Sequence, residues 1–127
     1  MAKILIVDDE TPIRRTLRDI LEFEGYEVDE AVDGLECVAK VQKEKYDVVI
    51  TDIKMPKMDG ITLMHKLRSD SWGKTVSIII LTNSDLNDAN LSSVVADQPT
   101  YYLIKSNCSP EEVLDKVNDV LINKKED

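Results

Sequence analysis

Short apolar runs alternate with helical patterns along this chain of 127 residues. The strongly apolar runs are Lys3–Val7, Tyr46–Thr51, Val76–Leu81 and Tyr101–Ile104. A weaker run, Tyr26–Ala31, alternates polar with apolar residues, which is typical of a strand at the edge of a sheet. Strands that alternate with helices form parallel sheets with helices on both faces. We therefore predict an α/β protein with a doubly wound, five-stranded parallel sheet.

Apolar residues at helical spacing predict helices between these runs. The first helix is expected to have Thr11 as its N-cap and Pro12 at its first position, and to stop at Gly25. The last helix begins with a capping box, in which Ser109 is the N-cap and Glu112 stands three residues later. Two further helices are expected from Gly34 to about Lys43 and from Ile61 to Leu67.

The segment Asn83–Ser93, between the fourth and fifth strands, is the weakest predicted element. It is crowded with Asn, Asp and Ser, whose side chains compete for the hydrogen bonds of a helical backbone. A short or mobile helix is expected there. The charged tail, residues 123–127, is expected to fray.

The composition indicates one soluble domain, residues 1–127, with 43% hydrophobic residues to form its core. No apolar stretch approaches the roughly 18–20 residues that a membrane-spanning helix needs, and no targeting segment is visible at the start. A cytoplasmic protein without membrane association is therefore expected. The net charge of −9 repels phosphate backbones, which argues against direct binding of nucleic acid.

Polar residues follow the apolar runs at the point where each run ends. They are Asp8 and Asp9 after the first run, Asp52 after the third, Thr82 after the fourth and Lys105 after the fifth. Because the carboxyl ends of parallel strands share one edge of a sheet, these side chains should meet in one crevice. Three close carboxylates need a cation or raised pKa values. Magnesium, which accepts carboxylate and phosphate oxygens, fits best, with manganese as the alternative.

The same residues suit phosphoryl transfer. A carboxylate can attack phosphorus and form an aspartyl phosphate. Lys105 can bind one phosphoryl oxygen as a point charge, and Thr82 can donate its hydroxyl hydrogen to another. Each residue also has a plainer explanation, since Asp8 and Asp9 could cap the first helix and Asp52 could stabilise the loop that follows it. Those explanations do not account for the position of all five residues at strand ends.

Four segments together resemble the receiver domain of two-component response regulators: Ile6–Glu10, Asp52–Gly60, Leu81–Thr82 and Tyr102–Lys105. The stretch Asp-Ile-Lys-Met-Pro-Lys-Met-Asp-Gly is the most specific of them. The resemblance covers essentially the whole chain, in order and with suitable spacing. It implies a flavodoxin-like (βα)5 receiver fold with the strand order 2-1-3-4-5.

The resemblance also implies a role for each site residue. Asp52 would be the phosphoacceptor. The magnesium ligands would be the side chains of Asp8, Asp9 and Asp52 and the backbone carbonyl of Lys54. Thr82 and Lys105 would bind the phosphoryl group once it is attached, and Tyr102 would change rotamer as Thr82 moves.

The implied function is a phosphorylation-activated signalling switch and not a conventional enzyme, although it would catalyse its own phosphotransfer and autodephosphorylation. The donor would be a phosphohistidine on a sensor histidine kinase or a phosphotransfer protein. A phosphoryl group adds roughly two negative charges, which would draw Thr82 and Lys105 toward it and bias the fourth helix. The surface of the fourth helix, fifth strand and fifth helix would then control a protein target or a fused effector, as a monomer or a phosphorylation-dependent dimer.

Three positions depart from the family pattern. Ser106 follows Lys105 where a proline, often after a cis peptide bond, is common. A cis bond without proline costs about 3–4 kcal/mol, so this loop is either strained or trans. Asn83 replaces a small residue and is expected to narrow access to Asp52 and to alter dephosphorylation. Gln98-Pro99 replaces a Gly-Ala turn after the fourth helix.

Two other functional classes compete with the switch. A phosphohydrolase of the haloacid-dehalogenase type would also form an aspartyl phosphate, but it needs a second aspartate two residues after the nucleophile, where this chain has Lys54. A receiver-like interaction module would never be phosphorylated, and the intact set of acidic, hydroxyl and lysine side chains argues against it. A small phosphodonor separates the three classes, because it gives a stoichiometric adduct, many turnovers or no label, respectively.

Overall fold

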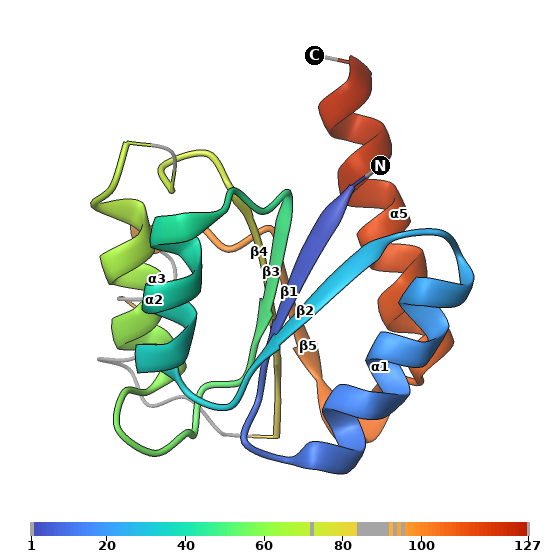
Figure 1. Ribbon diagram of the computed structural model, residues 1–127, viewed down its shortest axis with the longest axis horizontal. Helices are drawn as coiled ribbons and strands as arrows, with labels where there is room; N and C mark the ends of the chain where they lie inside the picture. Colours follow the sequence, from blue (N-terminus) through green and yellow to red (C-terminus); the bar gives the residue numbers. More distant parts are fainter. Residues whose placement is uncertain (1, 72, 84–91, 93, 95, 127) are drawn as a thin grey trace.

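The computed structural model describes residues 2–71, 73–83, 92, 94 and 96–126 of the chain (Figure 1). Its elements, in chain order, are β1 (Lys3–Val7), α1 (Thr11–Phe23), β2 (Glu27–Ala31), α2 (Gly34–Lys43), β3 (Val48–Thr51), α3 (Gly60–Arg68), β4 (Ser77–Thr82), β5 (Tyr101–Ile104), the 3-10 helix η1 (Lys105–Asn107) and α5 (Pro110–Glu126). The helix predicted at Asn83–Ser93 falls mostly on residues 84–91 and 93, which lie outside the described residues. Within the described part of the chain, no helix has the length and apolar character needed to cross a bilayer.

The strands form one five-stranded sheet in the order β2-β1-β3-β4-β5, and all neighbouring strands are parallel. β1 and β3 are neighbours in the sheet. The chain places β2 on one side of β1 and then places β3, β4 and β5 on its other side. The register aligns the strand ends: Val7 pairs with Thr51, Thr51 with Ile80, and Thr82 with Ile104. The predicted doubly wound sheet and its strand order are therefore confirmed.

Helices cover both faces of the sheet, with α2 and α3 on one side and α1 and α5 on the other (Figure 1). Alternate residues of β1 serve the two sides. Leu5 and Val7 join the core beneath α2 and α3, whereas Ile4 and Ile6 join the core beneath α1 and α5. β3 and β4 are buried along their whole length. Burial on both faces explains why these central strands are almost continuously apolar in the sequence.

Most helix ends follow local sequence signals. Gly25 follows α1 with φ of +97°, a left-handed conformation that glycine adopts easily. The capping box of α5 is confirmed, because the Glu112 N–H donates to Ser109 Oγ at 3.2 Å and the Ser109 N–H donates to the Glu112 carboxylate at 3.3 Å. The predicted N-cap of α1 is wrong, since Thr11 is the first helical residue. The Thr11 hydroxyl instead accepts a hydrogen bond from Arg14 at 3.1 Å.

The start of β1 and the end of α5 lie at the same end of the molecule (Figure 1). From there the parallel strands run toward the opposite end, where their carboxyl ends form one edge. The helical backbone of α5 continues to Glu126, so it includes most of the charged tail for which the sequence predicts fraying. The candidate site lies at the carboxyl edge, away from both chain ends.

Candidate functional site

The carboxyl ends of the strands surround a cavity of about 220 Å³. It is lined by Asp9, Glu10, Asp52, Lys54, Thr82, Asn83 and Lys105. These residues come from the β1–α1 loop, the loop after β3, the end of β4 and the start of η1. Of the predicted ligand, phosphoacceptor and phosphoryl-binding residues, five line this cavity and Asp8 lies beside it, whereas Tyr102 is not among the lining residues.

Three carboxylates gather beside the cavity. Oxygen atoms of Asp8, Asp9 and Asp52 all lie within 4.8 Å of one another. Asp8 and Asp52 are buried, while Asp9 is exposed. Burial raises the pKa of Asp8 above its ordinary value, although a hydrogen bond from Lys105 opposes this effect. An acidic, oxygen-rich cluster of this kind is suited to a hard divalent cation.

The Lys105 ammonium lies between two of these carboxylates. Its Nζ atom is 2.7 Å from an Asp52 oxygen and 2.8 Å from an Asp8 oxygen, and only 9% of the lysine side chain is exposed. Burial lowers the pKa of Lys105, but hydrogen bonds to Asp52 and Asp8 outweigh burial, so the pKa is raised. The ammonium therefore stays charged and offsets part of the negative charge of the cluster.

The backbone around Asp52 is packed closely. The Ile53 N–H donates to the Asp52 carboxylate at 2.6 Å and fixes its orientation. Gly60, at the start of α3, lies so close that a Cβ atom there would be 2.0 Å from the Asp52 carbonyl oxygen. The Gly60 N–H also donates to the Ile53 carbonyl at 2.8 Å. The glycine that ends the Asp-Ile-Lys-Met-Pro-Lys-Met-Asp-Gly stretch is thus required by the close approach of α3 to Asp52.

A buried arginine on α1, which the sequence reasoning missed, holds the loop that carries the acidic pair. Arg14 donates to the Asp8 carbonyl at 2.6 Å and to the Glu30 carboxylate at 3.1 Å. Arg18 donates to the same glutamate at 2.8 Å. The available signal was spacing, because Arg14 stands three residues before Leu17, on the buried face of the helix.

Of the residues predicted to respond to the phosphoryl group, Thr82 and Lys105 lie at the ends of the last two strands, and Tyr102 lies within β5. Thr82 is fully buried at the end of β4. Tyr102, in β5, is partly buried and packs against the core beneath α2 and α3. The described residues contain no cis peptide bond, so the bond between Lys105 and Ser106 is trans. Asn83 accepts a hydrogen bond at its Oδ1 atom from the Ser106 N–H at 2.9 Å.

The turn before β5 contains Gln98-Pro99, which stands where the family pattern has a Gly-Ala turn. Gln98 adopts φ of +52°, a conformation that is easier for glycine. Its carbonyl accepts a hydrogen bond from Arg68 at 3.0 Å, and Arg68 also donates to the carbonyls of Asp97 at 2.8 Å and Gly73 at 2.7 Å. Arg68 therefore ties the end of α3 to this turn, where a non-glycine residue holds a left-handed backbone.

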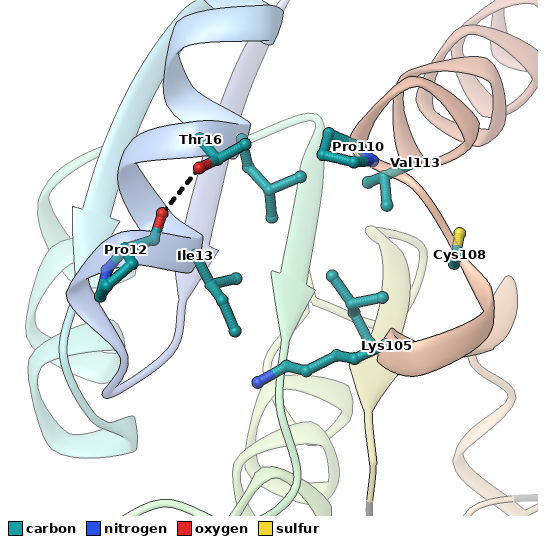
Figure 2. A pocket seen from close by; sticks show the side chains of 9 residues that line it. Pro12, Ile13, Thr16, Lys105, Cys108, Pro110 and Val113 are labelled. Atoms are coloured by element: carbon teal, nitrogen blue, oxygen red, sulfur yellow. Dashed lines mark hydrogen bonds between the residues drawn. The ribbon is translucent and has the colours of Figure 1, made fainter.

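A second hollow, of about 300 Å³, lies between α1 and the start of α5, and Lys105 runs along one side of it (Figure 2). Its walls are mostly apolar and include Pro12, Ile13, Leu17, Leu81, Pro110 and Val113. Since Lys105 also lines the acidic cavity, the two hollows are neighbours at the carboxyl edge. The edge therefore combines a charged site with an adjacent apolar recess.

A family model and a curated relative each match nearly the whole chain. A family model described as the response regulator receiver domain matches residues 4–118. The transcriptional regulatory protein ResD of Bacillus subtilis is 40% identical over 119 residues, which are 94% of this chain and 48% of ResD. The chain thus spans about half the length of this curated relative.

Solved structures show the same likeness in three dimensions. The chemotaxis protein CheY4 of Vibrio cholerae superposes with a TM-score of 0.85 at 37% identity, over 94% of this chain and 98% of that chain. The response regulator TrrA of Thermotoga maritima, solved in complex with Mg(2+)-BeF, gives a TM-score of 0.81 at 37% identity, over 94% and 99% of the two chains. At these identities the likeness concerns sequence as well as fold.

Proposed function

The chain belongs to the family of response regulator receiver domains, and from this membership we propose that it is a phosphorylation-activated signalling switch with Asp52 as phosphoacceptor. The choice of Asp52 as phosphoacceptor rests on one observation. Asp52 lies at the cavity, 2.7 Å from the Lys105 ammonium and within 4.8 Å of two other carboxylates. A receiver domain is not a conventional enzyme. Its proposed reactions are transfer of a phosphoryl group to its own side chain and the later loss of that group.

Phosphoryl transfer would begin with attack by an Asp52 oxygen on the phosphorus of a phosphohistidine. An O–P bond forms while the P–N bond breaks, and the imidazole leaves with the electron pair of that bond. Lys105 then binds a phosphoryl oxygen, and the Thr82 hydroxyl donates to another. The position of both residues on the cavity that contains Asp52 supports these roles.

The acidic cluster fits a magnesium ion, because it offers several carboxylate oxygens close together on the rim of an open cavity. The proposed ligands are the side chains of Asp8, Asp9 and Asp52 and the backbone carbonyl of Lys54. When bound, the ion would supply positive charge between the carboxylates and the incoming phosphoryl group. Manganese is the proposed alternative, since it also prefers oxygen ligands. Lys105 offsets part of the same negative charge from the side of η1.

The proposed output follows from what the phosphoryl group attracts. Thr82 and Lys105 lie at the ends of adjacent strands, so their displacement toward the new charge would shift the ends of β4 and β5. Tyr102 in β5, which pairs with Ile80 of β4 two residues before this edge, is the proposed rotamer switch. The fourth helix, β5 and α5 would then present a changed surface to a protein target or a fused effector.

The proposed donor is a sensor histidine kinase or a phosphotransfer protein. Its phosphohistidine must reach Asp52 at the carboxyl edge, where the apolar recess between α1 and α5 adjoins the acidic cavity (Figure 2). We propose that the donor packs apolar side chains into this recess. Their burial would contribute binding energy without placing further negative charge beside the acidic cavity.

The remaining features of the proposed switch are its setting and its assembly. Residues 1–127 are proposed to form a single receiver domain in the cytoplasm, either monomeric or dimerising on phosphorylation. We do not propose direct contact with nucleic acid, because the net charge of −9 repels phosphate backbones.

The deciding test is incubation of the chain with phosphoramidate and magnesium, followed by mass spectrometry. We expect addition of one phosphoryl group, its removal by hydroxylamine, and no addition to the Asp52→Asn variant. Asp19→Asn, on the exposed side of α1, is the matched control and should be labelled like the native chain. Turnover of many equivalents of donor without accumulation of a labelled chain would identify a phosphohydrolase, and an absence of both label and turnover would identify an inert interaction module.

A further inference from the structure

Two residues that depart from the family pattern contact each other at the edge of the site. Thr82 and Ile104 are the last residues paired in register between β4 and β5. Just beyond them, the Asn83 side-chain oxygen accepts a hydrogen bond from the Ser106 backbone N–H at 2.9 Å. The side chain of Asn83 thus continues the connection between the two strands after their backbone pairing has ended.

This contact depends on the identity of both residues. Ser106 has a backbone N–H to donate, whereas a proline at this position would have none. Asn83 supplies an amide oxygen at a position where a small apolar side chain would offer no acceptor. Because the peptide bond before Ser106 is trans and η1 begins at Lys105, the donated N–H belongs to the first turn after β5.

The hydrogen bond restrains the backbone on the far side of Lys105. On the near side, Ile104 is paired with Thr82 in the sheet. On the far side, Ser106 is held by the residue that follows Thr82. The lysine that reaches Asp52 and Asp8 is therefore attached to the end of β4 both before and after its own position.

We propose that Asn83 is a positioning residue, whose amide holds the backbone of Lys105 and couples its movement to that of Thr82. This inference rests on the proposed function, in which both residues respond to a phosphoryl group on Asp52. With the contact in place, the ends of β4 and β5 change conformation in one step. Without it, Lys105 is linked to β4 only through Ile104, and Thr82 and Lys105 respond at different rates.

Coupling through a hydrogen bond differs from an effect of side-chain size, and the two can be separated by substitution. Asn83→Leu keeps a side chain of similar shape but removes the acceptor. Asn83→Ala removes both the shape and the acceptor, whereas Asn83→Asp keeps an acceptor oxygen. If the amide acts only as bulk that narrows the cavity, the leucine variant should behave like the native chain.

The first measurement is hydrogen exchange of the Ser106 amide by nuclear magnetic resonance in the native chain without ligand. We expect exchange to be about fivefold faster in the Ala and Leu variants, the change that loss of about one net hydrogen bond implies, and native-like in the Asp variant. Equal exchange in the native chain and the Leu variant would show that Asn83 does not hold this backbone, and would overturn the proposal.

The second measurement is relaxation dispersion of the amides of Thr82 and Lys105 at partial saturation with magnesium and beryllofluoride, which mimics a phosphoryl group on a carboxylate. One exchange rate should describe both residues in the native chain and the Asp variant, and two rates at least about threefold apart should be needed in the Ala and Leu variants. A shared rate in the Leu variant, or separate rates in the native chain or the Asp variant, would overturn the coupling. If the native chain does not bind the mimic, the proposed function fails, and the exchange of the Ser106 amide alone decides the positioning role.

Discussion

At the scale of single residues, charged groups outside the cavity hold the loop that carries the acidic pair. Glu30 receives hydrogen bonds from Arg14 and Arg18, and Arg14 also donates to the backbone of Asp8. Burial raises the pKa of Glu30, but the hydrogen bonds from Arg18 and Arg14 outweigh burial, so its pKa lies below the ordinary value of 4.5. The charged form of Glu30 therefore stabilises the fold.

We expect Glu30→Gln to lower the free energy of unfolding by about 1 kcal/mol at neutral pH, since it weakens two charge-assisted hydrogen bonds at a partly exposed site. A lowered pKa in the folded state adds stability above the unfolded value, and that stability is lost as the pH falls through the folded value. Urea unfolding should therefore show the difference shrinking between about pH 5 and pH 3. Glu22→Gln, which removes only an exposed pair with Arg18, is the control and should change stability by less than about 0.5 kcal/mol.

A single methyl group at Gly60 should disturb both the fold and the site. A Cβ atom there would be 2.0 Å from the Asp52 carbonyl oxygen, so α3 or the loop after β3 has to move. We expect Gly60→Ala to lower the free energy of unfolding by about 1–3 kcal/mol and to slow labelling by phosphoramidate. Gly25→Ala is the comparison, because nothing lies within 4 Å of its added Cβ and only the backbone conformation is strained. That variant should lose about 1 kcal/mol and be labelled at the native rate.

At the scale of helices and strands, α1 and α5 have a function beyond covering the sheet, since their facing ends form the apolar recess beside Lys105. We expect Ile13→Lys to slow phosphoryl transfer from a donor protein by about tenfold or more, because a charge would enter the proposed docking recess. Labelling by phosphoramidate, which needs no docking, should be unchanged. Phe23→Lys changes a 91% exposed residue at the other end of α1, and the native rate is expected with both donors. Equal slowing with both donors would contradict the docking role of the recess.

The elements themselves could be predicted well, for a physical reason. β3 and β4 are buried on both faces, so their sequences are apolar throughout and their ends are marked by the first polar residue. The beginning of α1 was placed one residue late, because Thr11 and Pro12 fit the N-cap pattern as well as they fit the first two helical positions. A local pattern cannot tell these registers apart when the threonine hydroxyl binds Arg14 and not the helix end.

The site was predictable only in part. Position at strand ends identified which side chains share the carboxyl edge, since parallel strands bring those ends together. It could not identify the contacts among them, such as Lys105 between Asp8 and Asp52 or Asn83 on Ser106, because these depend on distances between loops far apart in sequence. Arg14 was missed because arginine is ordinarily a surface residue, although its spacing places it on the buried face of α1.

At the scale of the whole molecule, the acidic edge should make stability depend on magnesium. A ligand that binds only the folded state adds about 1.4 kcal/mol when its concentration is ten times its Kd. We expect the melting temperature of the native chain to rise with magnesium chloride, and the rise to be abolished in Asp9→Asn, where an exposed member of the cluster loses its charge. Asp19→Asn should keep the full rise. A rise of equal size in the Asp9 variant would place the ion elsewhere.

The start of β1 and the end of α5 both lie at the end of the molecule opposite the acidic edge (Figure 1). A module or a solid support joined to either end would therefore leave the approach of a phosphohistidine donor unobstructed. Any change that starts at Asp52 must also travel the full length of the sheet, about 17–20 Å for strands of ordinary length, before it reaches such an attachment. A receiving site and an attachment point thus lie at opposite ends of the molecule, and both the strands of the sheet and the helices that flank it connect them.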